Sequence, residues 1–211
     1  LSLGSVLLLA AAGLAITFGV MGVINMAHGE MVMIGAYTTY VVQELFKSYA
    51  PASIDYSLIA SIPAAFAVAG LIGIAIERGI IRFLYGRPLE TLLATWGVSL
   101  ILQQAVRDRF GASNVPVSAP SYMSGSFEFF GLVITYGRLW IVVFTLLAFA
   151  LLQFVIRASA LGLQMRAVTQ NRRMASAMGI RTGRIDALTF GLGSGIAGIA
   201  AVVLGIGVVD I

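Results

Sequence analysis

Three polar side chains interrupt a long apolar stretch near the start of the chain. Asn25, His28 and Glu30 lie between residues 1–24 and residues 31–43, two runs that contain no charged residue. Polar and ionisable groups are costly at membrane depth and usually face a bundle interior or a water-filled path. An amide, an imidazole and a carboxylate can together bind a small polar solute by hydrogen bonds. We therefore expect these three side chains to line a path for a solute.

The same segment predicts a break between two helices. Asn25 is a favourable N-cap, so a new helix is expected to begin at Met26, with Glu30 in or near its first turn. The alternative is an ordinary short loop at the membrane surface. However, no Lys or Arg lies near, although cytoplasmic loops usually carry them. Residues 31–46 alone would span only about 24 Å, short of a hydrocarbon core of about 30 Å, so the helix must begin earlier.

A second group of polar residues lies along residues 89–106. Such residues are rare against lipid, so this helix is expected inside the bundle, where it helps to shape the same path. Trp96 and Gln103 are seven residues apart and share a helix face, whereas Glu90 does not align with them strictly. The alternative places Glu90 and Gln104 at the two membrane interfaces. The candidates for the path on this helix are Glu90, Thr95, Trp96, Ser99 and Gln103.

Composition places the chain in a membrane. Of its 211 residues, 59% are hydrophobic and only 10% are charged, whereas a soluble domain carries about 25% charged residues. The net charge of +4 does not indicate nucleic-acid binding, because the basic residues cluster in particular loops. The chain has no cysteine and one histidine, which excludes disulfides, thiolate metal sites and multi-histidine metal sites. No metal site is expected.

The fold class predicted is all-α, a polytopic bundle of transmembrane helices. We expect one domain over residues 1–211 that continues beyond both ends. A ladder of small residues over 191–198 suits close helix packing, and the aromatic and β-branched segment 126–137 predicts a small periplasmic hairpin. The positive-inside rule puts nine basic residues in the cytoplasm and four outside. The expected spans are residues 1–24, 26–46, 57–76, 89–106, 138–156 and 186–211.

The longest cytoplasmic connection, residues 157–184, holds six arginines and no acid. Asn171 is expected to cap a short helix that runs to Met178, and Gly179 to end it as the glycine after the C-cap. Such an exposed basic helix can dock on a cytoplasmic partner. The alternative is a solvated loop helix attracted to the headgroups of anionic membrane lipids.

These segments resemble a known family. Residues 22–30, which read Gly-Val-Ile-Asn-Met-Ala-His-Gly-Glu, and residues 35–37, Gly-Ala-Tyr, resemble the permease subunit of bacterial ABC importers of the branched-chain amino acid and urea type. Residues 162–180 are similar to that family's coupling loop, although Arg173-Met174-Ala175 stands where Glu-Ala-Ala is usual. The resemblance covers essentially the whole chain. Within the family, residues 38–43 and 87–99 look most like the urea-transporting branch.

The resemblance implies a multi-pass transport subunit of the bacterial inner membrane. Its implied partners are a second related permease, cytoplasmic ATPase subunits and a periplasmic solute-binding protein, with membrane lipid around it and no nucleic acid. The chain lacks the Gly-x-x-x-x-Gly-Lys-Ser/Thr loop, so no enzymatic activity is expected, and ATP would bind to the partner rather than to a cofactor site here. The residues implied in coupling to the ATPase are Asn171, Arg172, Arg173, Ala175 and Gly179.

Urea is the expected solute. It is small and neutral, and a path that carries Asn25, His28 and the polar residues of 89–106 can replace its hydration without a fixed charge. Branched-chain amino acids are the first alternative. A zwitterion needs a partner for its carboxylate, and no expected span has Lys or Arg in its interior, but a helix N-terminus can serve. A passive urea or water channel is an alternative of another class, and it would not need the docking loop.

Overall fold

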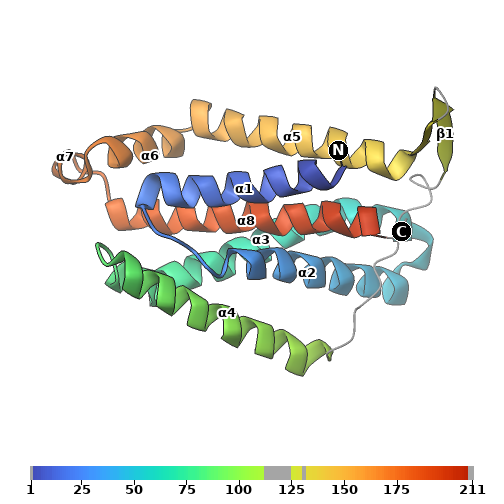
Figure 1. Cartoon of the computed structure of the whole chain (residues 1–211), viewed down its shortest axis with the longest axis horizontal. Coiled ribbons are helices and arrows are strands. Elements are labelled where there is room, and N and C mark those ends of the chain that lie inside the picture. Colours follow the sequence, from blue (N-terminus) through green and yellow to red (C-terminus); the bar gives the residue numbers. More distant parts are fainter. Residues whose placement is uncertain (1, 112–124, 130–131, 209–211) are drawn as a thin grey trace.

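The computed structural model describes residues 2–111, 125–129 and 132–208, and within this part of the chain six helices of 20 to 27 residues run side by side (Figure 1). The bundle confirms the predicted all-α polytopic fold. Part of the connection between the fourth and fifth predicted spans lies outside the described residues. The long helices are α1 (Ser2–Met21), α2 (His28–Tyr49), α3 (Ser57–Gly79), α4 (Pro88–Phe110), α5 (Tyr136–Ala158) and α8 (Thr182–Val208).

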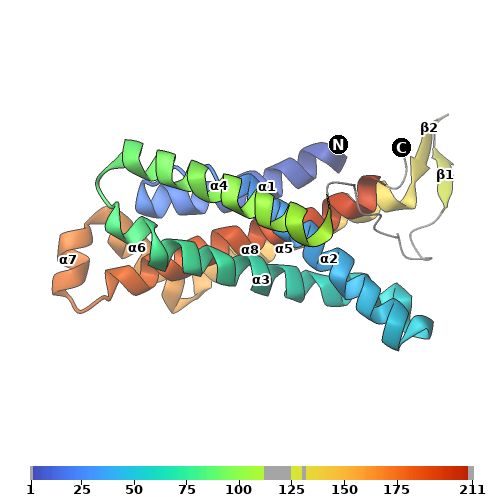
Figure 2. The ribbon, with the colours of Figure 1, turned by 90° about the horizontal axis from the view of Figure 1, so that it is seen from below.

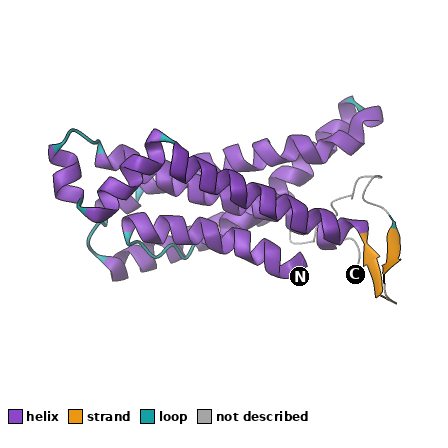
Figure 3. Ribbon diagram, turned by 90° about the horizontal axis from the view of Figure 1, so that it is seen from above, coloured by secondary structure: helices purple, strands orange, loops and turns teal. Residues whose placement is uncertain are grey.

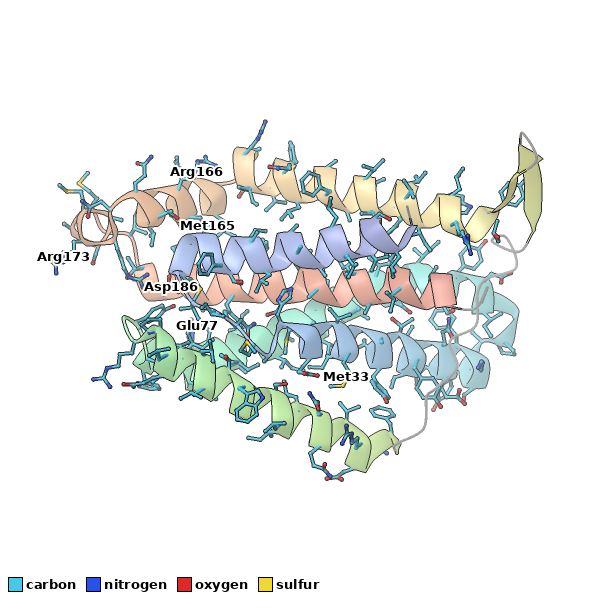
Figure 4. The ribbon with its side chains drawn as sticks, viewed as in Figure 1. Met33, Glu77, Met165, Arg166, Arg173 and Asp186 are labelled. Atoms are coloured by element: carbon cyan, nitrogen blue, oxygen red, sulfur yellow. The ribbon has the colours of Figure 1, made fainter. Side chains whose placement is uncertain are left out.

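Short elements close the two ends of the bundle (Figure 3). At one end lie the α3–α4 connection and the segment between α5 and α8, where Figure 4 places Arg166 and Arg173. The positive-inside rule makes this the cytoplasmic end. At the other end two antiparallel strands pair Ser126 with Thr135, which confirms the predicted hairpin. The short elements are η1 (Pro51–Tyr56), η2 (Ile81–Phe83), β1 (Ser126–Phe129), β2 (Leu132–Thr135), α6 (Ala160–Gln170) and α7 (Arg172–Ala177).

The six long helices differ in how apolar they are. Among the described residues, four segments are long and apolar enough to cross a membrane: Leu3–Met21, Ser53–Phe83, Tyr136–Ala158 and Thr182–Leu204. Helices α2 and α4 have similar lengths but carry more polar residues. In the α8 segment 78% of the most apolar stretch is buried inside the protein, against 17–33% in the other three segments. Helix α8 is therefore the central helix, and α2 and α4 need neighbours for their polar groups.

Glycines allow the neighbours of α8 to pack against it directly. A methyl group added at Gly35 on α2 would lie 2.3 Å from the carbonyl oxygen of Gly198, and one at Gly13 on α1 would lie 2.5 Å from that of Gly193. On the α3 side, a methyl group at Gly73 would meet the hydroxyl of Ser194 at 2.4 Å. These contacts confirm that residues 191–198 form a small-residue packing ladder.

Candidate functional site

The backbone between α1 and α2 turns back into the bundle (Figure 1). Gly22 has a φ of +65°, and the chain is not helical again until α2 begins at His28. His28 Nε2 shares a 2.9 Å hydrogen bond with the carbonyl oxygen of Ala10, a residue eleven positions before the end of α1 at Met21. At 1.5 Å per residue, α2 thus begins about 16 Å above the cytoplasmic end of α1. The break lies near the middle of the bundle and not at its surface.

The non-helical segment is held by side chains. Thr95 on α4 accepts a hydrogen bond from the backbone N–H of Met26 at 3.2 Å, and the side-chain oxygen of Asn25 accepts one from the N–H of Ala27 at 3.0 Å. Irregular backbone at membrane depth is tolerated only where protein buries it or where it lines a cavity. Thr95 therefore links α4 to the break.

The expected start of the second helix was wrong by two residues. Helix α2 begins at His28 instead of Met26, and Asn25 closes a turn onto Ala27 instead of capping the helix. Residues 26–27 form a turn instead, in which His28 N bonds to Asn25 O and Glu30 N to Ala27 O, and the regular helix follows this turn. The prediction of a broken helix is confirmed.

A carboxylate lies between α2 and α4. Glu30 Oε1 accepts hydrogen bonds from the hydroxyl of Ser99 at 2.7 Å and from Gln103 Nε2 at 2.8 Å. Gln103 also donates to Ser99 at 3.3 Å, so the three side chains form a closed triangle. Hydrogen bonds to an ionised carboxylate are among the stronger ones. Figure 4 shows Met33, one turn further along α2, in the same space between the two helices.

Two buried polar atoms at the break have no hydrogen-bond partner among the described residues. They are Asn25 Nδ2 and His28 Nδ1. An unpaired buried polar atom costs about 1–3 kcal/mol, so few are kept without a reason. Beside them Gly29 is exposed, and no atom would lie within 4 Å of a methyl group there. The start of α2 thus carries two buried, unpaired hydrogen-bonding groups next to an exposed glycine.

The structure brings most of the expected path residues together. Thr95 bonds to the backbone of Met26, next to Asn25, and Glu30 contacts Ser99 and Gln103. His28 turns towards α1 instead of α4. Glu90 and Trp96 are not part of this group. Glu90 is exposed and pairs with Arg87 at 3.1 Å, and Trp96 is 54% exposed, one residue and therefore 100° around the helix from Thr95. Their place in the path stays a prediction.

The coupling segment has the local structure that its sequence predicts. Asn171 Oδ1 accepts a hydrogen bond from Met174 N at 3.0 Å, and Gly179 has a φ of +88° after the last turn of α7. Asn171 and Met178 are the N-cap and C-cap of the helix, as expected, and its helical residues are Arg172–Ala177. Arg173 is exposed at the outer end of the bundle (Figure 4), while Ala175 is buried. Contact with an ATPase stays a prediction.

The sequence analysis missed a buried polar cluster at the cytoplasmic end. Glu77 belongs to α3 and is 1% exposed, although the span expected here ended at residue 76, and Asp186 on α8 is fully buried. The Tyr85 hydroxyl donates to Glu77 Oε1 at 3.3 Å. Burial, together with the nearby carboxylates of Asp186 and Glu77, raises the pKa of Tyr85, so its hydroxyl keeps its proton. A signal was present, since Asp186 is a lone acid directly after the arginine-rich segment.

Taken together, a bundle of apolar helices, a break at mid-depth and a polar group beside it define a multi-pass membrane protein that moves a polar solute. Residues 1–210 match the family model of the permease component of branched-chain amino acid transport systems. The chain belongs to this family. It is therefore a transport subunit of the ABC importer type in the inner membrane, as the resemblance implied.

Curated relatives share the family over nearly the whole chain. The high-affinity branched-chain amino acid permease BraD of Pseudomonas aeruginosa is 34% identical over 211 residues, covering 97% of this chain and 68% of the relative. The corresponding permease LivH is 34% identical in Salmonella typhimurium and 33% identical in Escherichia coli K12, with the same coverage. No solved structure matches the chain. The relatives' names support amino acid transport and give no support for urea.

Proposed function

We propose that the chain is a permease subunit of an ATP-driven importer of branched-chain amino acids. The relatives named for this activity support it. In this proposal the chain pairs with a second related permease, and cytoplasmic ATPase subunits act on α7. A periplasmic solute-binding protein delivers the amino acid. The chain itself is the conduit, and ATP is bound and hydrolysed by the partner.

The observation that carries the choice of solute is the first turn of α2. An amino acid is a zwitterion, so its site must complement an ammonium group and a carboxylate at once. Glu30 supplies a carboxylate for the ammonium group, already oriented by Ser99 and Gln103. The N-terminal end of α2 attracts a carboxylate through its dipole. Asn25 Nδ2 adds a donor that has no described partner.

The surroundings of this turn also suit an aliphatic side chain. Val98 on α4 is 8% exposed, and Leu102, one turn further, packs partly buried against the same apolar cluster. Met33 extends into the space between α2 and α4 (Figure 4). Methionine is flexible and adapts to ligands of different shape. Charge at one end and apolar residues at the other match leucine, isoleucine and valine better than they match urea.

Reconstitution tests this proposal. The permease pair, the ATPase subunits and the binding protein are placed in liposomes, and uptake of labelled leucine and labelled urea is measured with and without ATP. ATP-dependent uptake of leucine is expected. Uptake of urea alone would overturn the proposed solute, and uptake that persists without ATP would indicate a passive channel.

A matched pair of variants sharpens the test. Glu30→Gln removes the charge between α2 and α4, whereas Glu44→Gln removes an exposed carboxylate near the other end of α2. Loss of a charge-assisted hydrogen bond is worth about 1.5–3 kcal/mol, so Glu30→Gln should weaken leucine uptake at low concentration by tenfold or more. Uptake by the Glu44→Gln variant should stay near that of the unmodified protein. Equal effects of the two variants would remove Glu30 from the site.

A further inference from the structure

A polar cluster joins four segments at the cytoplasmic end. Arg172, the first residue of α7, donates to Asp186 on α8, with Nη1 3.2 Å from Oδ1 and Nη2 in contact with Oδ2. The guanidinium carbon of Arg172 lies 4.7 Å from the ring centroid of Tyr85, in the connection between α3 and α4. Tyr85 in turn donates to Glu77 on α3. Figure 4 places Glu77 and Asp186 at the same end of the bundle.

The two adjacent arginines of α7 have different surroundings. Arg173 is exposed, as expected for a residue that docks on a partner. Arg172 instead points into the protein, where both of its terminal nitrogens face a carboxylate that is fully buried. A planar guanidinium paired at two points and stacked on an aromatic ring holds one geometry, which lysine cannot reproduce. Arg172 therefore fixes α7 relative to α8.

From Arg172 the contacts lead in two directions. The first runs through Asp186 into α8, whose Gly193 packs against Gly13 of α1 near His28 and whose Gly198 packs against Gly35 of α2. The second runs through Tyr85 to α4, because the Thr91 hydroxyl of α4 donates to Leu84 O at 3.2 Å. Helix α4 carries Ser99 and Gln103, the partners of Glu30. Both directions end at the candidate solute site.

The covalent connection between α7 and α8 is a weaker link. Residues 178–181 are not helical, and Gly179 has a positive φ. Such a connection can bend when α7 is pushed. The Arg172–Asp186 pair resists bending, since separating it would leave a charge unpaired in a buried position.

We propose that Arg172 is a positioning residue that transmits movement of α7 to α8 and α4, and that it does not contact the ATPase itself. The inference rests on the proposed function, in which the ATPase acts on α7. It goes further by assigning different roles to Arg172 and Arg173, two adjacent arginines that the sequence pattern does not distinguish.

The test follows a reporter that does not depend on the solute. Because the chain has no cysteine, Met26→Cys introduces a single thiol in this subunit at an exposed position of the break. Its reaction rate with a water-soluble reagent is compared in the nucleotide-free and ATP-trapped complexes. In the Arg172→Lys variant the difference in thiol reaction rate between the nucleotide-free and ATP-trapped complexes should shrink on the order of fivefold or more. The ATPase should still co-purify in the usual amount. Arg173→Lys is the control, and it should keep the difference.

A second variant separates transmission from folding. Arg172→Met with Asp186→Leu replaces the ion pair, in which Asp186 is buried and the Arg172 side chain is 40% exposed, by apolar side chains. Such a replacement of a buried pair often leaves stability unaltered. This double variant should assemble, yet also lose the difference in thiol reactivity. A full difference in Arg172→Lys or in the double variant would overturn the proposal, as would loss of ATPase co-purification in folded Arg172→Lys. If leucine is not imported but the reporter depends on Arg172, the proposed solute fails and this inference stands.

Discussion

Helix α4 and the central helices α1, α2, α3 and α8 are held in different ways. The central helices touch through glycines, several of which bring backbone against backbone, as Gly35 does with Gly198 and Gly13 with Gly193. Helix α4 forms the lower edge of the bundle in Figure 1 and is seen along its whole length in Figure 2. It is linked to the break and α2 by Thr95, Ser99 and Gln103 and by the stacked rings of Tyr37 and Phe110, 4.7 Å apart.

We expect this difference to separate a fixed part, the central helices, from a part that can move, helix α4. Close packing of rigid backbones has one good arrangement, and a small shift produces a clash or a void. Hydrogen bonds can be exchanged for bonds to a solute or to water at little net cost. We therefore expect α4 to move against the central helices during transport, and Glu30 to exchange its partners as it does so.

The largest effect is expected from a methyl group placed in the fixed part. Gly35→Ala puts a carbon 2.3 Å from Gly198 O and 2.6 Å from its Cα, so two backbones must separate. Overpacking of this kind costs about 1–3 kcal/mol and sometimes more. The matched variant is Gly97→Ala on α4, where nothing lies within 4 Å. It should be neutral, or stabilise its helix by up to about 1 kcal/mol.

Thermal unfolding in detergent, followed by size-exclusion chromatography, distinguishes the two variants. Gly35→Ala should lower the yield of folded protein strongly, and Gly97→Ala should not. If both variants unfold alike, α4 is packed as rigidly as the central helices and the comparison fails.

The next largest effect concerns the break itself. Asn25→Leu removes the acceptor of the Ala27 N–H and the donor that has no described partner, so uptake should be abolished. His28→Gln keeps a group able to bond to the carbonyl of Ala10, so part of the uptake should remain. Uptake assays in liposomes measure both. Equal loss in the two variants would show that the break is only structural.

Accessibility at the break adds a direct readout. A cysteine at position 25 or 28 should react with a small water-soluble thiol reagent, and solute should slow the reaction. Reactivity that responds neither to solute nor to the state of the ATPase would place the break outside the solute path.

A smaller effect is expected where α4 meets Glu30. Gln103→Leu removes one of the two hydrogen-bond donors that α4 provides to the carboxylate and leaves Ser99 as the other. We expect uptake at low solute concentration to fall by about tenfold, the equivalent of about 1.4 kcal/mol. The neighbouring Gln104 is exposed and bonds to Asp108 instead, so Gln104→Leu is a matched control with little effect. A larger effect at position 104 would reverse our assignment of the faces of α4.

The sequence predicted features that depend on local patterns. The long apolar stretches predicted the helices, Asn171 and Gly179 predicted the limits of α7 to within a residue or two, and the small residues near Gly193 predicted the packing ladder. Each follows from residue types a few positions apart.

Features that depend on tertiary contacts could not be predicted in this way. The depth of the break follows from His28 meeting Ala10, and the link between the break and α4 follows from Thr95 meeting Met26 N. Likewise, the arginine-rich segment gave no reason to distinguish Arg172 from Arg173, because the difference lies in Asp186, fourteen residues away. Trp96 is a further example. Its spacing from Gln103 predicts that the two share a face of α4, but the spacing does not indicate which face of α4 packs against the bundle.

The smallest effect is expected at Gly179, which ends α7. Its φ of +88° suits glycine, and nothing lies within 4 Å of an added methyl group, so Gly179→Val introduces backbone strain without a clash. A residue with a side chain in this conformation costs about 1–2 kcal/mol. That strain opposes the bonds from Gly179 N to Ser176 O and from Ile180 N to Ala175 O that close the end of the helix. The control is Gly183→Val, at an open position without positive φ.

We expect Gly179→Val to leave assembly intact, to speed amide hydrogen exchange in residues 172–178 by several-fold to about tenfold, and to lower the amount of solute imported per ATP hydrolysed. The loss should be milder than that of Gln103→Leu, because the solute site is unchanged and only the stiffness of α7 is affected. Normal coupling in a normally expressed Gly179→Val variant would argue that α7 does not carry the ATPase movement. In that case α4 must receive its displacement from elsewhere on the cytoplasmic face.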